Sequence, residues 1–141
     1  MNYFVTGASG FIGRRLVEKL LRRDNGTVYY LILERELPMV EQLRQRWGGA
    51  SDRTVPIIGD LTLPRLGVAD ADIARLKGEI GHLLHLAAVY DLKASAEAQE
   101  RVNVEGTRNA VAFAEAIEVG HFHLTSSIAA AGLYEGVFRE D

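Results

Sequence analysis

The chain has 141 residues, a formal net charge of −3 and no cysteine. This length allows one domain with its own core, and a content of 48% hydrophobic and 25% charged residues is ordinary for a globular protein. Without cysteine there is no disulfide, thiolate nucleophile or cysteine-ligated zinc. The charge predicts no nucleic-acid partner. Because no apolar run reaches about 18 residues and no signal peptide is visible, we expect no membrane span and a cytoplasmic protein.

Short apolar segments alternate along the chain with segments of helical period, a pattern typical of βαβ units. The predicted strands cover residues 3–6, 27–33, 55–58, 82–86 and 121–126. The predicted helices cover residues 11–23, 39–47, 70–77 and 94–117. The fold class is therefore α/β: a Rossmann-type, doubly wound parallel sheet in three layers that ends after about five strands, with the strand order 3-2-1-4-5.

Two of these helices carry apolar residues at spacings that define one side. In helix 11–23 we expect a buried side, formed by Ile12, Leu16, Val17, Leu20 and Leu21. In helix 94–117 one side carries Val104, Val111, Ala114 and Ile117. Tyr3, Tyr29, Tyr30 and Trp47 are interpreted as packing residues, because no basic stripe accompanies them.

A glycine-rich turn joins the first strand to the first helix, in the sequence Thr6-Gly7-Ala8-Ser9-Gly10-Phe11-Ile12-Gly13. So tight a turn needs backbone angles that residues with a Cβ reach only at a cost. It leaves N–H groups and a helix N-terminus directed at one point, which suits a pyrophosphate. We assign Gly7 to the turn, Gly10 to close approach of the phosphates and Gly13 to close packing of the helix on the strand. The context favours a dinucleotide site over a merely structural turn.

Polar and small residues follow each of the other predicted strands. They are Glu34 and Arg35, Gly59-Asp60-Leu61, Ala87 and Ala88, and Ser126 and Ser127. In an open parallel sheet the ligand crevice lies beyond the carboxyl ends of the strands, at the point where the strand order reverses. We therefore expect these residues to border one crevice.

Five segments together resemble the extended short-chain dehydrogenase/reductases, in matching order over nearly the whole chain. They are 6–13, Gly59-Asp60-Leu61, His85-Leu86-Ala87-Ala88, Asn103-Val104-Glu105-Gly106-Thr107 and Thr125-Ser126-Ser127. Residues 59–67 and Ala87-Ala88-Val89-Tyr90 are more narrowly similar to the fatty acyl-CoA reductase and thioester reductase branch, with its male-sterility-type NAD-binding domain. That branch reduces thioesters to aldehydes or alcohols with NADPH.

The resemblance implies specific roles for residues of this chain. Those implied to bind the cofactor are Thr6, Gly7, Ser9, Gly10, Phe11, Ile12, Gly13, Arg14, Glu34, Arg35, Asp60, Leu61, Ala87 and Ala88. Ser127 aligns with the catalytic serine, and Asn103 aligns with a helix asparagine that organises a water-based proton relay. Structural alternatives stay open for each: Asp60 as a turn residue, Asn103 as a loop anchor and Ser127 as a cap.

The identity of the dinucleotide depends on the residues after the second strand. Glu34 suits a ribose 2′-hydroxyl and hence NAD, whereas Arg35, with Arg14 or Arg15, suits a 2′-phosphate. The resemblance favours NADP, although such relatives usually place an arginine where this chain has Leu33. We predict NADP, with NAD as the alternative.

We predict no metal site, because His82 and His85 point to opposite faces of their strand. His121 and His123 share a face, but the sequence offers them no third ligand.

The resemblance implies hydride transfer from a nicotinamide to the carbonyl carbon of a small-molecule substrate, an acyl thioester or an aldehyde. Ser127 would donate a hydrogen bond to the developing oxyanion. The family's tyrosine, with a lysine four residues later, has no counterpart here, since Tyr134 is followed at that spacing by Phe138. We therefore expect residues 1–141 to form the N-terminal NAD(P)-binding domain of a longer reductase, without its C-terminal substrate lobe and inactive alone.

Two other functions remain open from the sequence: a sugar-nucleotide epimerase or dehydratase of the same superfamily, and a non-catalytic dinucleotide sensor. The resemblance also implies that the full-length protein forms a homodimer through the helix at residues 94–117, since this helix pairs between subunits in that superfamily.

Overall fold

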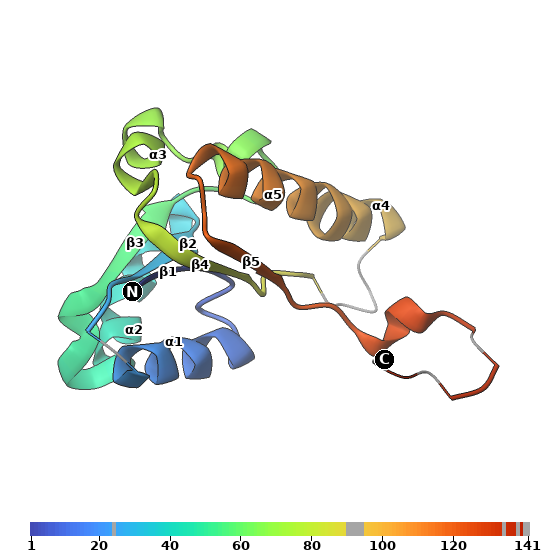
Figure 1. Cartoon of the computed structure of the whole chain (residues 1–141), viewed down its shortest axis with the longest axis horizontal. Helices are drawn as coiled ribbons and strands as arrows, with labels where there is room; N and C mark the ends of the chain where they lie inside the picture. The colour runs from blue at the N-terminus through green and yellow to red at the C-terminus, as the bar shows by residue number, and fades with distance from the viewer. Residues whose placement is uncertain (24, 90–94, 134, 138, 140–141) are drawn as a thin grey trace.

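Five parallel strands form one sheet in the order β3-β2-β1-β4-β5 (Figure 1). The computed structural model describes residues 1–23, 25–89, 95–133, 135–137 and 139. The strands are β1 (Asn2–Thr6), β2 (Val28–Ile32), β3 (Thr54–Ile58), β4 (Ile80–His85) and β5 (His121–Leu124). This confirms the predicted strand order and the doubly wound α/β class. Tyr90, Ala94, Tyr134 and Phe138, named in the sequence predictions, lie outside the described residues.

Helices cover the sheet on both faces (Figure 1). On one face lie α1 (Phe11–Arg23) and α2 (Val40–Trp47), and on the other lie α3 (Asp70–Leu76) and α5 (Gly106–Ala116). Short 3₁₀ helices occur at Glu34–Met39, Gly48–Arg53, Pro64–Gly67 and Ile128–Ala131. Among the residues that the structure describes, no helix is both long and apolar enough to span a bilayer.

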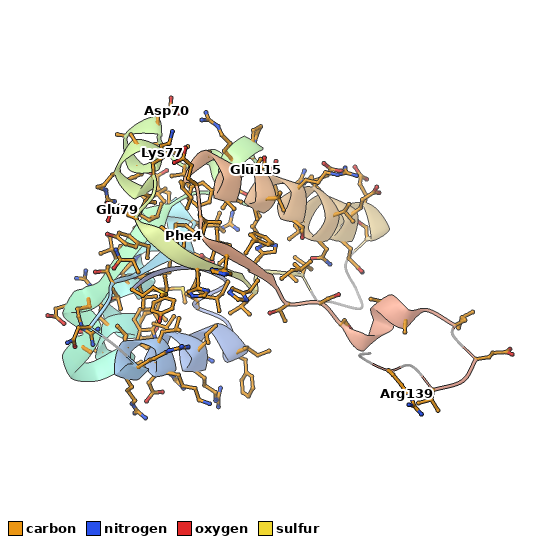
Figure 2. The ribbon with its side chains drawn as sticks, viewed as in Figure 1. Phe4, Asp70, Lys77, Glu79, Glu115 and Arg139 are labelled. Carbon is orange, nitrogen blue, oxygen red and sulfur yellow. The ribbon has the colours of Figure 1, made fainter. Side chains whose placement is uncertain are left out.

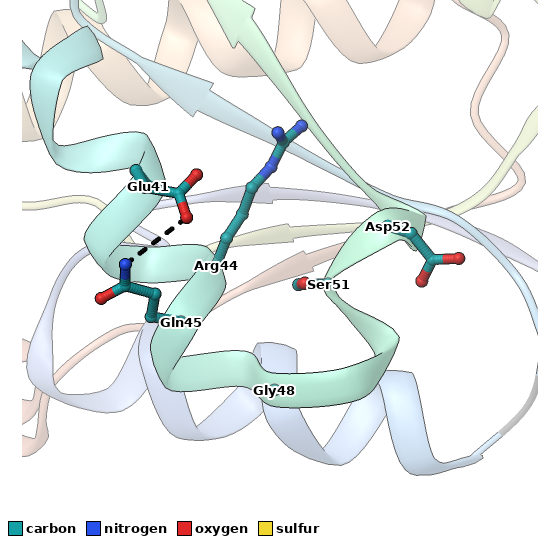
Figure 3. Close-up of a pocket in the computed structure, with 6 residues that line it drawn as sticks. All are labelled: Glu41, Arg44, Gln45, Gly48, Ser51 and Asp52. Carbon is teal, nitrogen blue, oxygen red and sulfur yellow. Dashed lines mark hydrogen bonds between the residues drawn. The ribbon is translucent and has the colours of Figure 1, made fainter.

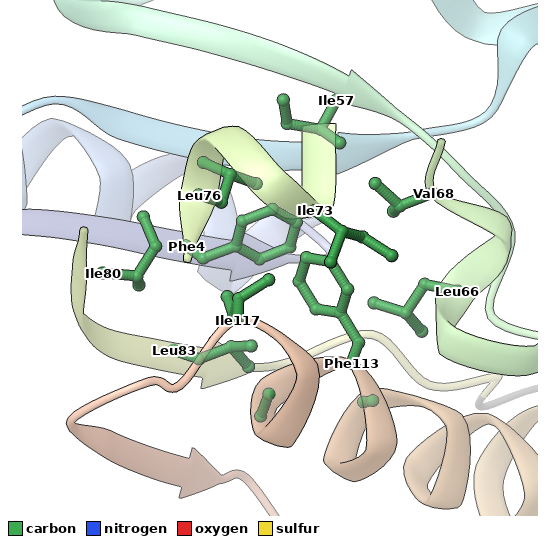
Figure 4. Packing of buried hydrophobic residues seen from close by; sticks show 12 residues of the cluster. Phe4, Ile57, Leu66, Val68, Ile73, Leu76, Ile80, Leu83, Phe113 and Ile117 are labelled. Atoms are coloured by element: carbon green, nitrogen blue, oxygen red, sulfur yellow. The ribbon is translucent and has the colours of Figure 1, made fainter. Parts of the chain in front are cut away.

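The two layers of helices enclose two separate apolar clusters. In one, Phe4 of β1 packs against Phe113 of α5 with ring centroids 4.8 Å apart (Figure 4). In the other, the Tyr30 ring meets the Trp47 ring edge-on at 5.3 Å. Burial of each such side chain contributes about 1.5–3 kcal/mol, so these pairs hold the helices to the sheet.

Charged side chains lie outside these clusters. In Figure 2 Phe4 lies centrally within the sheet, while charged side chains mark the outer surface of the layer that contains α3 and α5. Those labelled there are Asp70, Lys77, Glu79 and Glu115, all of them exposed. Lys77 pairs with Glu118 at 3.0 Å. The pair is exposed, so it adds little to stability.

Helix α1 has the predicted bounds, but its buried side differs from the prediction at one position. Gly13, Val17, Leu20 and Leu21 are buried, whereas Ile12 is 59% exposed. Gly13 faces the glycine turn. Because successive residues of an α-helix are rotated by about 100°, the preceding residue, Ile12, points away from the sheet. The prediction of a buried Ile12 was therefore wrong.

The predicted helix 94–117 is divided into three parts. These are α4 (Ala96–Gln99), a π-helical turn (Glu100–Glu105) and α5. The prediction that Val104 and Val111 share a side with Ala114 and Ile117 was wrong, since the first two are 45% and 40% exposed and the last two are buried. The stripe that meets the sheet is centred on Ala110, Phe113 and Ile117, which leaves Val111 on the outer side.

Candidate functional site

The turn after β1 is closed by its own backbone. Gly7 has a φ of 74°, in the left-handed region, and its carbonyl oxygen accepts a hydrogen bond of 3.0 Å from the Gly10 N–H. A Cβ at Gly7 would lie 2.8 Å from the backbone nitrogen of Ala87 at the end of β4. Position 7 therefore requires glycine for two reasons: its left-handed backbone angle, and the lack of space for a side chain beside Ala87.

Gly13 allows helix α1 to lie against this turn. A Cβ at Gly13 would lie 2.0 Å from the Gly7 carbonyl oxygen and 2.8 Å from the Ala8 Cα. At Gly10 the nearest such contact is 3.2 Å, to the same oxygen. The contact that needs Gly13 is thus made with the turn itself, whereas the predicted contact was with the strand.

A cleft of about 530 Å³ opens at the carboxyl ends of the strands, at the reversal of strand order between β1 and β4. It is lined by Gly7, Ser9, Gly10, Leu31, Leu33, Arg35, Glu36, Gly59, Asp60, Leu61, Thr62, Leu86, Ala87, Ala88, Val89, Arg101 and Val102. This is where the doubly wound fold places its ligands.

The structure brings most of the predicted cofactor residues together. Gly7, Ser9, Gly10, Arg35, Asp60, Leu61, Ala87 and Ala88 line the cleft. Thr6 and Gly13 are buried beneath it. Phe11, Ile12, Arg14 and Glu34 are not among the lining residues. Phe11 is 69% exposed, and the Arg15 guanidinium lies 3.9 Å above its ring.

Asp60 follows β3 and is held by a tight turn. Its Oδ1 accepts hydrogen bonds of 2.8 Å from both the N–H and the hydroxyl of Thr62, so the structural role as a turn residue is present. Gly59 before it has no room for a side chain, because a Cβ would lie 2.4 Å from the Leu66 carbonyl oxygen. A carboxylate accepts about four hydrogen bonds, which leaves the second oxygen of Asp60 available to a ligand.

Asn103 lies in the π-helical turn and anchors the segment after β4. Its Oδ1 accepts from the Val89 N–H at 2.8 Å, and its Nδ2 donates to the Val89 carbonyl at 3.0 Å. The loop-anchor alternative for Asn103 is therefore present in the structure. π-Helical turns are frequent at functional sites, and this one borders the cleft.

Two charged residues that the sequence predictions omitted also line the cleft. Glu36, in the place expected for Glu34, accepts a 3.4 Å hydrogen bond from the Leu33 N–H. Arg101 enters from the π-helical turn, where regular helical periodicity gave no signal for it. Within the described residues, the guanidinium groups of Arg35 and Arg101 have neither an ion-pair nor a hydrogen-bond partner. Two unpaired cations thus border the cleft.

Ser127 follows β5 at the same edge of the sheet as the other predicted residues, although it does not line the cleft. It is exposed, and its carbonyl oxygen accepts a hydrogen bond of 2.9 Å from Ala130 at the following 3₁₀ helix. The structure thus places Ser127 and Asn103 at separate positions around the cleft.

A second hollow lies between α2 and the 3₁₀ helix that precedes β3 (Figure 3). Its volume is about 450 Å³, and it is lined by Glu41, Arg44, Gln45, Gly48, Ser51 and Asp52. None of these was a predicted site residue, and the hollow lies toward the amino ends of the strands. It has no glycine cradle of the kind seen at Gly7, so we assign the site to the first cleft.

Within the described chain, no group of three or more histidine, aspartate or glutamate side chains is arranged to hold a metal ion. The cleft does fit a dinucleotide, because Gly7, Ser9 and Gly10 line it just before the N-terminus of α1, where main-chain N–H groups and the helix dipole attract a pyrophosphate.

Comparisons with known proteins agree with this geometry. A family model described as male sterility protein, an NAD-binding domain, matches residues 5–141. A linear gramicidin synthase protein from Brevibacillus parabrevis is 31% identical over 140 residues, which is 94% of this chain and 3% of that protein. Fatty acyl-CoA reductase 1 of Arabidopsis thaliana is 28% identical over 148 residues, which is 89% of this chain and 30% of that protein.

A solved structure gives the same result. The terminal R domain from the myxalamid PKS-NRPS biosynthetic pathway matches with a TM-score of 0.84 and 27% identity, over 96% of this chain and 36% of that one. The chain thus spans about a third or less of each of these relatives. The family model covers the glycine turn and the whole sheet except the first three residues of β1. The chain therefore belongs to the male sterility protein family and corresponds to the N-terminal part of fatty acyl-CoA and thioester reductases.

Proposed function

We propose that the cleft binds NADP(H), with NAD(H) as the alternative, and that the chain is the cofactor-binding part of a reductase acting on an acyl thioester or an aldehyde. One observation carries the proposal: Gly7 has a left-handed backbone and lies so close to the Ala87 backbone that no residue with a side chain fits at position 7. Main-chain N–H groups and the start of α1 then face the cleft, which favours an anionic pyrophosphate.

The preference for the phosphorylated coenzyme is supported by the guanidinium group of Arg35, which lines the cleft and is unpaired within the described residues. Arg35 lies in the 3₁₀ helix that follows β2. In this fold class the ribose of a dinucleotide lies near the end of that strand. A guanidinium matches phosphate oxygens with two parallel hydrogen bonds. Glu36 lines the same region and is the residue that would favour an unphosphorylated ribose instead.

When bound, a nicotinamide dinucleotide supplies a hydride for the reduction of a carbonyl carbon. The residues of this chain would hold and orient the coenzyme. The glycine turn would bind the pyrophosphate, Asp60 and Leu61 would bind the adenine, and Ala87 and Ala88 would let the coenzyme lie close to the end of β4. Ser127 would donate a hydrogen bond to the substrate oxygen, and Asn103 would order water beside Val89. The substrate class is supported by two relatives named above, a fatty acyl-CoA reductase and a terminal R domain.

Isothermal titration calorimetry with NADPH and with NADH tests the proposal. Ala88→Leu adds a large side chain at an exposed position of the cleft lining and should abolish or strongly weaken binding. Ala74→Leu makes the same change at an exposed position of α3, outside the cleft, and should bind as the wild type does.

Two results would contradict the proposal. One is the absence of binding heat with both coenzymes in folded protein. The other is equal binding by Ala88→Leu and the wild type, which would place the coenzyme elsewhere.

A further inference from the structure

A buried histidine joins β1, β4 and α5 through hydrogen bonds. His85, the last residue of β4, is 2% exposed, and its Nδ1 lies 2.7 Å from the hydroxyl oxygen of Thr6, its neighbour on β1. Its Nε2 lies 3.3 Å from the hydroxyl oxygen of Thr107 on α5. The His85 ring thus connects β1, which leads into the glycine turn, with α5.

The direction of these bonds follows from counting donors at Thr6. The Thr6 Oγ1 accepts a hydrogen bond of 3.2 Å from the Ala87 N–H, and it shares the Leu86 N–H, at 3.2 Å, with the Thr6 carbonyl oxygen, at 3.3 Å. Because N–H donors face this oxygen, the Thr6 hydroxyl donates its own proton to Nδ1 of His85, 2.7 Å away, which is the acceptor that the described residues offer it. An Nδ1 that accepts a hydrogen bond carries no proton, so the proton of a neutral ring lies on Nε2.

The other end of the chain of bonds has the same direction. The Nε2–H of His85 donates to the Thr107 oxygen, and the Thr107 hydroxyl donates at 2.7 Å to the carbonyl of Asn103, one turn earlier. The Asn103 side chain in turn holds both polar backbone groups of Val89. The hydroxyl and imidazole hydrogen bonds of the series all run in one direction, from Thr6 through His85 to Thr107 and the Asn103 carbonyl, which favours cooperative strengthening.

We propose that His85 is a positioning residue for the coenzyme cleft, locked as the neutral Nε2–H tautomer between Thr6 and Thr107. In this role it fixes the glycine turn, the end of β4 and the π-helical turn relative to one another. The inference rests on the proposed function only in that the cleft holds a dinucleotide. The series of hydrogen bonds itself exists in the ligand-free protein.

The surroundings of His85 agree with a neutral ring. Besides the two threonines, the Phe122 ring of β5 lies 6.1 Å from it, and burial alone lowers its pKa. A proton added at Nδ1 would make that atom a donor facing the Thr6 oxygen, which already receives backbone N–H groups, and would leave the Thr6 hydroxyl without its acceptor. Protonation of His85 therefore breaks the link to Thr6 rather than strengthening it.

The tautomer can be observed directly in the whole chain. A long-range ¹H–¹⁵N NMR spectrum identifies which nitrogen of each imidazole carries a proton, and His85→Phe assigns the His85 signals by their loss. We expect Nε2–H and a bare Nδ1 for His85 at neutral pH. A proton on Nδ1 would overturn the inference whether or not any coenzyme binds.

Coenzyme affinity provides a second, independent measurement. His85→Phe keeps a ring but removes both hydrogen bonds, to Thr6 and to Thr107, and should raise the Kd for NADPH about tenfold or more. His85→Gln retains a donor toward Thr107 and should show a smaller rise. Ile117→Val, fully buried in the same layer but outside the series, is the matched control and should leave the Kd unchanged.

Amide hydrogen exchange separates this inference from the proposed function. Thr107→Val removes the hydroxyl at the far end of the series, and Thr107→Ser keeps it. If His85 transmits position, Thr107→Val should speed exchange at Leu86 and Ala87, and Thr107→Ser should not. Equal exchange in both variants, or equal Kd changes in His85→Phe and Ile117→Val, would overturn the positioning role. If the wild type binds no dinucleotide, the proposed function fails, and the His85 tautomer and amide exchange still decide the inference.

Discussion

The Nδ1 atom of His82 on β4 lies 2.8 Å from Nε2 of His123 on β5. His121 stacks on His82 as well, with ring centroids 4.8 Å apart, so three imidazoles share one exposed region of the sheet. The sequence placed His121 and His123 on one face but did not place His82 beside them. Parallel pairing of β4 with β5 does so, because His82 is opposite His121.

This cluster predicts a loss of stability in mild acid. Burial, then repulsion by His121, His123 and Arg23, lowers the pKa of His82. The unfolded chain therefore binds more protons than the folded chain between about pH 6.5 and the lowered pKa of His82, and the free energy of unfolding falls as pH decreases through that interval. His82→Gln should reduce this slope in urea unfolding measured between about pH 7.5 and pH 5.

The slope should not vanish in that variant, because burial also lowers the pKa of His85 and contributes in the same direction. Equal slopes for the wild type and His82→Gln would show that the cluster does not titrate as the structure implies.

Gly13→Ala should destabilise the fold more than Gly10→Ala does. The new Cβ at position 13 would lie 2.0 Å from the Gly7 carbonyl oxygen, against 3.2 Å for position 10, so only the former forces α1 away from the turn. Overpacking of this kind costs about 1–3 kcal/mol of unfolding free energy. Urea denaturation of the two variants measures the difference, and the reverse order of stability would contradict the packing described.

Arg35→Ala should lower the affinity for NADPH while leaving that for NADH nearly unchanged. Removal of a guanidinium from a phosphate costs a charge-assisted hydrogen bond, which corresponds to about a tenfold rise in Kd. Arg46→Ala, an exposed arginine of α2 outside the cleft, is the control. If Arg35→Ala weakened both coenzymes equally, Arg35 would not recognise the 2′-phosphate.

Arg101→Ala separates a general electrostatic effect from recognition of one phosphate. Arg101 lines the cleft on the side of the π-helical turn, whereas Arg35 follows β2. We expect similar, severalfold increases in Kd for NADPH and NADH, reduced at high salt because the charge is exposed. Titrations at low and high ionic strength measure this, and Arg108→Ala, on the outer side of α5, controls for net charge.

The coarse fold was predictable because it depends on local patterns. Alternation of apolar strands with helices determines a parallel sheet, and right-handed crossovers then leave few strand orders. The glycine turn was predictable for the same reason, since it requires backbone angles that only glycine adopts without a steric penalty. The predicted bounds of α1 also agree with the structure, because its apolar periodicity is a local pattern.

The finer features depend on contacts between distant segments. Helical period alone did not tell which side of α5 meets the sheet, and Val111 lies outside because Phe113 takes the contact with Phe4. The π-helical turn brings Arg101 to the cleft, and regular periodicity contains no signal for such a turn.

The sheet, the glycine turn and the set of strand ends could be derived from the residues alone, because they follow from backbone geometry and apolar periodicity. That Glu36 rather than Glu34 borders the cleft, and that His85 links Thr6 to Thr107, became visible in the folded chain. Such pairings join residues far apart in the chain. Their geometry depends on how whole elements pack, and no local pattern encodes it.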